Sequence, residues 1–218
     1  MDYGALTANV AELDAYLAQL GAPAKADVAA FSYEQAVAYW INAYNAFTLK
    51  SIVERYPVKS IKDISGVWDK RKWKAGGDEV TLDQIEHGLL RPLGDPRVHA
   101  AINCASVGCP PLADGAYTGG ELNKQLDAAA RRWAQSKARN TFDPGKKEAH
   151  VTKIFKWFGE DFVKGYHQPG RFPKLSDEES AAVSFLYKYA TDADRKIIDA
   201  GIEDVDYLDY DWGLNDAK

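Results

Sequence analysis

Helix-start signals, spaced unevenly along the chain, constrain the fold of this sequence more than any other feature. Each signal is a Ser or Thr followed three residues later by Gln or Glu, so that each side chain can cap the other residue's backbone N–H. The pairs are Ser32 with Gln35, Thr81 with Gln84, Thr118 with Glu121, and Ser176 with Glu179. Because such capping predicts where a helix begins, we expect a helix to open at each of these places.

Short strands are predicted between and beyond these helices, including a hairpin around Gly76-Gly77. The predicted strands are residues 73–75, 79–81, 98–102, 148–152 and 205–212. Helices and short strands separated by unequal loops predict an α+β fold rather than a regular strand–helix alternation. We therefore expect several helices packed on a small, mostly antiparallel sheet.

A single domain accommodates a chain of this length. Apolar residues recur at helical spacing from Leu6 to Leu20, and Gly21 follows as a stop. This pattern predicts that residues 1–30 form an N-terminal helical extension and that residues 31–218 form a single α+β domain.

The charge pattern argues against one class of partner. The 218 residues carry a formal charge of −5 with scattered basic residues, whereas nucleic-acid binding usually needs a concentrated basic face. No window has the apolar length of a membrane span, and no glycine-rich phosphate loop is present. We therefore expect no nucleic-acid partner, no integral membrane segment and no nucleotide cofactor.

Residues 97–112 gather the groups most capable of chemistry. They include both cysteines of the chain, together with His99 and Asn103. Cys104 precedes Ala105 and Ser106, whose small side chains admit a substrate and whose N–H groups we expect to be free for an oxyanion. Cys109 precedes two prolines, which have no N–H to donate. Cys104 is therefore the favoured nucleophile of the two.

His87 is the candidate general base. It lies four residues after Asp83 and four before Arg91, which puts an acid, an imidazole and a guanidinium on one helix face. Asp83 or Glu86 would orient the imidazole, as the third member of a catalytic triad does. His99 lies five residues before the favoured cysteine, and in an extended strand this odd spacing points the two side chains to opposite faces. His99 is therefore only the substitute base.

Two asparagines, Asn42 and Asn45, lie about one turn apart within a predicted aromatic helix, where a buried amide needs hydrogen-bond partners. Two interpretations stay open. The amides either tie the helix to the backbone of a loop, or one of them orients a catalytic imidazole or donates to an oxyanion.

The cysteine pair admits interpretations other than catalysis. The loop between Cys104 and Cys109 is long enough to bring the two Cα atoms within disulfide range, and a disulfide is the expected state in an exported protein. A metal site would need two further ligands, with His87 and His99 the nearest candidates. The cysteine spacing fits no strong zinc signature. Catalytic thiol, disulfide and metal site all stay open at this point.

Several spaced blocks of the sequence resemble domain-of-unknown-function family 547. The blocks are residues 39–46, 85–91, 99–112, 153–157 with 161–162, and 210–215. The resemblance implies a bacterial and often exported protein, although the family also occurs in plants, and it implies no settled activity. An exported or periplasmic protein whose leader was removed is thus expected, with a cytoplasmic protein as the alternative.

The resemblance also implies which residues to watch. They are Asn42, Asn45, Glu86, His87, Arg91, His99, Asn103, Cys104, Cys109, Asp211 and Trp212. The order of helix and strands is similar in outline to papain-like and transglutaminase-like folds. Those enzymes place the nucleophilic cysteine at the start of the central helix, where this chain has none, and a fold does not by itself give a function.

These observations give a leading hypothesis and two alternatives. The leading hypothesis is a cysteine-dependent hydrolase or acyltransferase acting on an amide or thioester bond of a small-molecule or peptide substrate, without a cofactor. Its candidate catalytic residues are Cys104, Cys109, His87, His99, Glu86, Asp83, Asn103 and Asn45, and its candidate substrate-binding residues are Arg91, Asn42, Trp40, Asp211 and Trp212. The first alternative is a non-enzymatic exported binding or structural module with a Cys104–Cys109 disulfide. The second is a metal-dependent enzyme.

Overall fold

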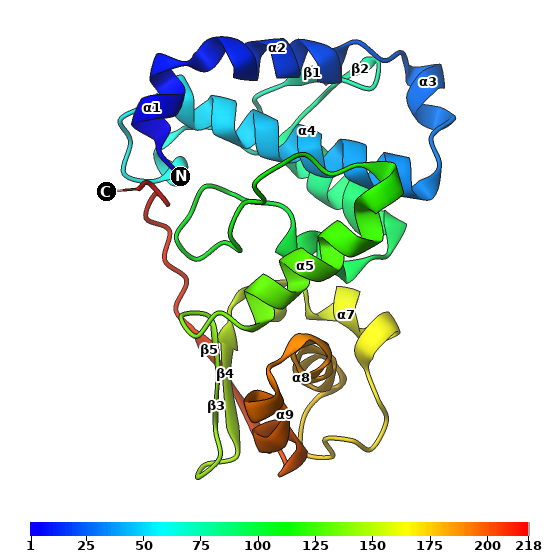
Figure 1. The fold of residues 1–218 in the computed structure, drawn as a ribbon, viewed down its shortest axis with the longest axis vertical. Helices are drawn as coiled ribbons and strands as arrows, with labels where there is room; N and C mark the ends of the chain where they lie inside the picture. Colours follow the sequence, from blue (N-terminus) through cyan, green and yellow to red (C-terminus); the bar gives the residue numbers. More distant parts are fainter. Residues whose placement is uncertain (218) are drawn as a thin grey trace. The chain divides into compact units, whose positions relative to one another are not determined.

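The computed structural model describes residues 1–217, which form two compact units (Figure 1). The first unit contains residues 1–94, 101–125 and those from 211 on, and the second contains residues 95–100 and 126–210. Helices accompany a two-stranded and a three-stranded sheet, and two of the three strand pairings are antiparallel. The predicted α+β class with small, mostly antiparallel sheets is confirmed.

The first unit is built around one long helix, α4. In chain order its elements are α1 (Tyr3–Ala8), α2 (Val10–Gly21), α3 (Lys25–Ala29), α4 (Tyr33–Val53), the 3₁₀ helix η1 (Ile61–Asp63), β1 (Trp73–Ala75), β2 (Asp78–Val80), the π-helix η2 (Gln84–Leu90), and the 3₁₀ helices η3 (Arg91–Leu93) and η5 (Gly119–Glu121). Helix α4 begins where predicted, because Ser32 and Gln35 cap each other's backbone N–H groups. Helix α2 lies alongside α4 in Figure 1.

Helix α4 is buried around most of its circumference, as expected for a helix at the centre of a core. Ile41 and Phe47 are fully enclosed, and the Phe47 ring stacks on Trp73 of β1 with ring centroids 4.8 Å apart. Trp40, a predicted substrate-binding residue, is 8% exposed and meets the Tyr39 ring edge to face. The same helix carries Asn42 and Asn45, so the core fixes the position of both amides.

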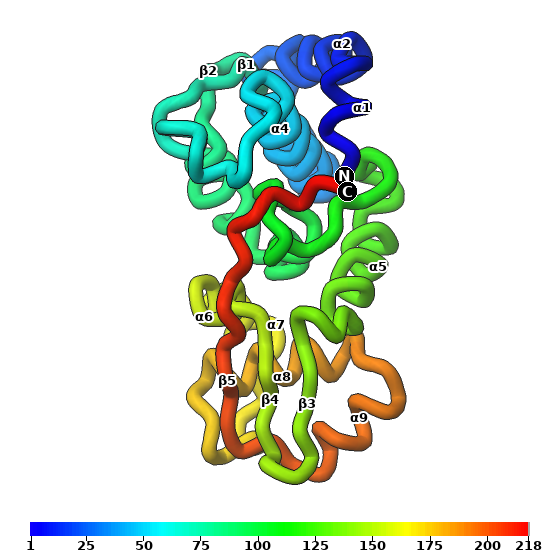
Figure 2. The backbone as a smooth tube through the Cα atoms, turned by 90° about the vertical axis from the view of Figure 1, so that its left-hand side faces the viewer, coloured from blue at the N-terminus to red at the C-terminus, as the bar shows by residue number. Residues whose placement is uncertain are grey.

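The first residues of the chain lie beside residues 215–217 within the first unit, as Figure 2 shows. The Met1 ammonium donates to the Asn215 carbonyl over 3.0 Å, and the Tyr3 hydroxyl donates to Asn215 Oδ1 over 2.8 Å. These bonds hold Asn215 of the C-terminal segment against the first residues of the chain.

The second unit places helices on one face of a three-stranded sheet. Its elements are η4 (Pro96–Ala100), most of α5 (Leu122–Ala134), β3 (Asn140–Asp143), β4 (Glu148–Thr152), α6 (Ile154–Trp157), α7 (Gly159–Tyr166), α8 (Asp177–Tyr189), α9 (Asp192–Asp199) and β5 (Asp204–Leu208). The strand order is β3-β4-β5, with β3 antiparallel and β5 parallel to β4 (Figure 2).

Aromatic rings fill the core of this second unit. Trp133 stacks on Phe155 with centroids 4.8 Å apart, and Phe185 meets Phe162 edge to face at 5.0 Å. Alternate residues of β4 and β5, including Val151 and Val205, face these rings. The residues between them therefore lie on the opposite face of the sheet.

Three sequence-based expectations are corrected. Residues 98–102 form no strand, because η4 (Pro96–Ala100) is a 3₁₀ helix opened by a turn in which the Asp95 side chain accepts the Arg97 N–H. A short apolar run cannot by its pattern be told apart from a buried helical turn. The Thr118 hydroxyl caps nothing, and Gln125 Oε1 accepts the Thr118 N–H instead. The C-terminal strand ends at Leu208 rather than at residue 212.

Candidate functional site

Cys104 and Cys109 are joined by a disulfide, with their Cα atoms 6.3 Å apart. Cys109 is buried, Cys104 is partly exposed, and the Cys104 N–H donates to Cys109 Sγ over 2.9 Å. Within the described residues no cysteine remains as a free thiol. Of the three interpretations of the cysteine pair, the structure therefore supports the disulfide. In the disulfide-bonded state the pair provides neither a thiolate nucleophile nor a thiolate metal ligand.

The buried Asn103 side chain stabilises the conformation of the disulfide loop. It is 4% exposed, and its Nδ2 donates to the Pro110 carbonyl over 2.7 Å. Its Oδ1 accepts the Ala105 N–H over 2.8 Å and Asn215 Nδ2 over 3.1 Å. The expectation that the Ala105 N–H is free for an oxyanion is wrong, because the neighbouring amide already uses it.

The two asparagines of α4 bind loop backbone. Asn45 Oδ1 accepts the Asn103 N–H over 2.8 Å, and Asn45 Nδ2 donates to the Ala101 carbonyl over 3.0 Å. Asn42 makes the same two-bond clamp on Tyr117, accepting its N–H over 2.9 Å and donating to its carbonyl over 2.8 Å. Both amides thus bind helix α4 to loop backbone, as the first of the two interpretations predicts. A catalytic role for either amide stays a prediction.

The C-terminal segment supports the other side of the disulfide loop. The Val107 and Gly108 N–H groups donate to the carbonyls of Gly213 and Asp211 over 2.8 and 2.9 Å, respectively. Asp211 Oδ1 in turn accepts the Gly213 N–H over 2.8 Å. The Trp212 carbonyl accepts the Ser60 hydroxyl over 2.7 Å. Asp211 and Gly213 therefore contribute the backbone bonds that hold this loop, while the Trp212 carbonyl binds Ser60 instead.

The histidine of η2 lies beside the charged groups that its spacing predicts. Arg91 Nη1 is 3.2 Å from His87 Nδ1. Because a guanidinium only donates, this bond needs a neutral imidazole that accepts at Nδ1 and carries its proton on Nε2. Burial raises the pKa of Asp83, and His87 opposes that rise only when its imidazole is protonated. Arg91 thus engages the lone pair with which His87 would act as a general base.

His99 has a different environment. It belongs to the second unit, is 3% exposed, and stacks on Phe158 with ring centroids 4.4 Å apart. Its Nε2 lies 2.8 Å from Asp161 Oδ2 on α7. The strand-based reasoning about its orientation does not apply, because His99 lies on the 3₁₀ helix η4.

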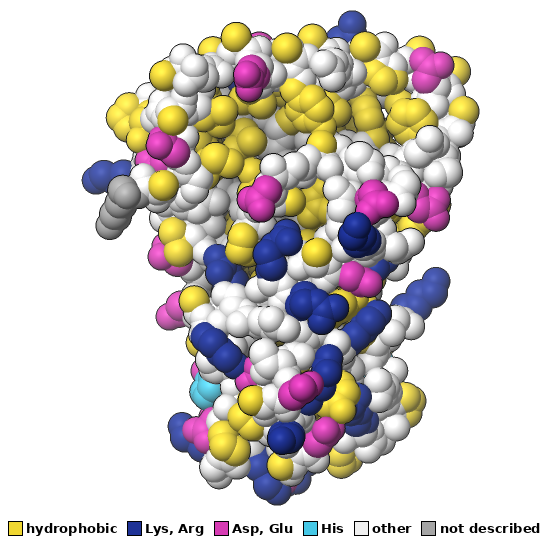
Figure 3. All heavy atoms as spheres, in the orientation of Figure 1, with side chains coloured by type: hydrophobic (Ala, Val, Ile, Leu, Met, Phe, Trp, Pro, Cys, Tyr) yellow, Lys and Arg dark blue, Asp and Glu magenta, His cyan; other side chains and the backbone are white. Residues whose placement is uncertain are grey.

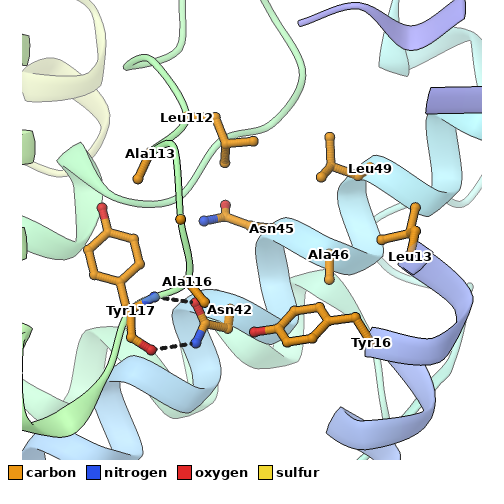
Figure 4. Close-up of a pocket in the computed structure, with 11 residues that line it drawn as sticks. Leu13, Tyr16, Asn42, Asn45, Ala46, Leu49, Leu112, Ala113, Ala116 and Tyr117 are labelled. Carbon is orange, nitrogen blue, oxygen red and sulfur yellow. Dashed lines mark hydrogen bonds between the residues drawn. The ribbon is translucent and has the colours of Figure 1, made fainter. Parts of the chain in front are cut away.

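A pocket of about 160 Å³ lies next to the disulfide loop in the first unit (Figure 4). Helix α4 forms one side, α2 forms another, and the segment that follows Pro110-Pro111 forms the third. The lining residues are Leu13, Tyr16, Asn42, Asn45, Ala46, Leu49, Leu112, Ala113, Gly115, Ala116 and Tyr117. Hydrophobic side chains gather over α2 and α4 in Figure 3. The pocket is mostly apolar, because the bonds described above occupy the amides of Asn42 and Asn45.

Tyr16 contributes a polar group to this pocket. Among the described residues its hydroxyl makes no hydrogen bond, and burial raises the pKa of the phenol, so it stays protonated at neutral pH. Figure 4 shows its ring reaching from α2 toward Asn42. No sequence pattern selects Tyr16, Leu49 or Leu112, because their helical or loop patterns are those of ordinary packing residues.

Comparison with known proteins gives a match to a family model but indicates no activity. Residues 28–133 match the family described as protein of unknown function, DUF547, so the resemblance seen in the sequence is confirmed. Searches of curated proteins and of solved structures gave no match, and similarity to papain-like folds is not shown. In the part of the chain that the structure describes, no helix has both the length and the apolarity to cross a bilayer.

Proposed function

We propose that this protein is a non-enzymatic binding module whose first unit holds a small, mostly apolar ligand in the pocket between α2, α4 and residues 112–117. The observation that carries the proposal is this pocket, at whose edge lies the Tyr16 hydroxyl, which makes no hydrogen bond among the described residues. Cavities of about 150 Å³ hold molecules the size of benzene. The ligand class is therefore a compact, uncharged molecule with a single hydrogen-bonding group.

The loop that forms the third side of the pocket is held rigidly, which favours binding. Cys109 closes the disulfide just before Pro110-Pro111, Asn103 holds the Pro110 carbonyl, and Asn42 clamps Tyr117 at the far end. A wall fixed at both ends loses little conformational entropy when a ligand enters, so more of the contact energy appears as affinity.

Other observations weigh against catalysis in this state. The disulfide occupies both sulfur atoms, Asn103 takes up the Ala105 N–H, and Arg91 engages His87 Nδ1. Disulfides persist in oxidising compartments, so the pair also supports the proposal that the protein is exported.

The proposal is tested by measuring the binding of phenol and of toluene, two probes of similar size of which only phenol has a hydroxyl group. We expect both to bind the wild-type protein by isothermal titration or ligand-observed NMR, with phenol the tighter because it can hydrogen-bond to Tyr16. In Tyr16→Phe, phenol should lose about 1 kcal/mol, roughly fivefold in Kd, while toluene is unchanged.

Filling the pocket provides the matched steric test. Ala46 is 3% exposed and lines the pocket, whereas Ala18 is an exposed alanine on α2. Ala46→Leu should abolish binding of both probes, and Ala18→Leu should leave it intact. Equal binding by both variants, or no binding of either probe to the wild type, would refute the proposed pocket function.

A cysteine-dependent hydrolase or acyltransferase is the second candidate, and the partial exposure of Cys104 favours it. Its Sγ lies 3.6 Å from Ser106 Oγ, so a reduced Cys104 would have a polar neighbour. Because the disulfide blocks the thiol, hydrolysis of a thioester should appear only after reduction and be lost in Cys104→Ser. Activity that reduction does not change would exclude this candidate.

A further inference from the structure

The outer face of the three-stranded sheet in the second unit carries a row of polar side chains. Because successive residues of a strand point to opposite faces, Glu148 and His150 of β4 share one face while Ala149 and Val151 enter the core. Strand β5 runs parallel to β4 with Asp206 directly beside His150. The sheet register alone therefore brings two carboxylates and an imidazole together.

The three side chains converge closely. Asp206 Oδ2 lies 3.2 Å from His150 Nδ1, and Glu148 Oε2 lies 3.7 Å from His150 Nε2. One ligand atom from each residue can be chosen so that all three lie within 4.8 Å of one another. Ligand atoms around a four-coordinate zinc ion lie about 3.3 Å apart, so small side-chain rotations suffice to close the set.

The backbone beneath this cluster is held by the sheet. Both strands are paired, and their alternate residues are anchored in the aromatic core, so the three Cβ positions are fixed before any ion arrives. Sites built on strands hold their ligands more accurately than sites on loops. The imidazole and both carboxylates remain reachable, with 25%, 18% and 56% of the His150, Glu148 and Asp206 side chains exposed.

We propose that Glu148, His150 and Asp206 form a binding site for a divalent transition-metal ion such as Zn²⁺. One imidazole nitrogen with two carboxylate oxygens suits Zn²⁺, Ni²⁺ or Co²⁺, whereas Mg²⁺ and Ca²⁺ prefer oxygen ligands alone. Three protein ligands leave a coordination position for solvent, as open zinc sites do. Lys146 is a competing cation, because its Nζ lies 3.9 Å from Glu148 Oε2.

Metal binding by the full-length, metal-stripped protein tests this site directly. We expect titration calorimetry to show one Zn²⁺ per chain, and Co²⁺ to produce visible d–d absorption that Zn²⁺ displaces. His150→Gln and Asp206→Asn should each weaken Zn²⁺ binding by about tenfold or more. Lys146→Ala should tighten it by about twofold to threefold, because a neighbouring positive charge is removed.

His167 offers a matched control, since its Nε2 lies 3.6 Å from a single carboxylate oxygen, on Asp177. His167→Gln should bind Zn²⁺ as the wild type does. Three results would overturn the proposal: no Zn²⁺ bound by the wild type, equal binding by the His150→Gln variant, or displacement of Co²⁺ by an equal concentration of Mg²⁺.

Discussion

At the scale of single residues, buried carboxamides organise the first unit. Asn103 and Asn45 together make five hydrogen bonds, four of them to backbone groups of residues 101–110. Leaving a buried backbone group without a partner costs more than the bond itself contributes, so these amides are expected to matter for stability. A carboxamide can also donate a hydrogen bond to an oxyanion, so the sequence alone does not distinguish a structural role from a catalytic one.

Replacing Asn103 separates these roles. Asn103→Ala leaves the Ala105 N–H and the Pro110 carbonyl without their partner and should lower the free energy of unfolding by about 2–4 kcal/mol in urea denaturation. Asn9→Ala is the control, because the exposed Asn9 side chain makes one bond, to the Ala5 carbonyl; its effect should stay below about 0.5 kcal/mol. A loss for Asn103→Ala as small as the control's would contradict the structural role.

At the scale of elements, the helix-start signals differ in what they do. Ser32 and Ser176 form the complete reciprocal cap at α4 and α8. Thr81 and Gln84 also form both bonds, although the helix that follows is the π-helix η2. Thr118 has the same sequence pattern without the bonds, because Gln125 reaches its N–H. An identical local pattern thus has different outcomes when a competing acceptor is near.

These caps predict a measurable contrast. Ser32→Ala and Ser176→Ala should each lower the free energy of unfolding by about 1 kcal/mol, because each removes an acceptor for a helix N–H. Thr118→Ala should change it by less than about 0.3 kcal/mol, since its hydroxyl caps nothing. Chemical denaturation of the three variants provides the check, and an equal loss in all three would contradict the structure.

At the scale of the whole molecule, the chain has two compact units, and the disulfide belongs to only one of them. The loop that it closes is short, so the chain-entropy model assigns it about 2 kcal/mol. The prediction that residues 31–218 form a single domain stays a prediction, and calorimetry that resolves one or two unfolding transitions would test it.

Reduction should therefore act on the first unit. Intact mass should rise by two hydrogen atoms after reduction. Hydrogen exchange should then speed up in residues 101–117, which the disulfide and the asparagine bonds hold, and stay unchanged around the Trp133 and Phe185 core. The Cys104→Ser/Cys109→Ser variant should show the same pattern without reductant. Uniform acceleration along the whole chain would be inconsistent with a local role for the disulfide.

The sequence by itself determined features that depend on near neighbours. Capping at Ser32 and Ser176, the hairpin around Gly76-Gly77 and the α+β class follow from capping, turn chemistry and periodicity over a few residues. Tertiary structure alone decided how Asn45 and Asn103 are bonded, which residues surround the pocket, and that Asp206 lies beside His150. Those arrangements join segments far apart in the chain, and their free energy comes from burial and long-range pairing that no local pattern encodes.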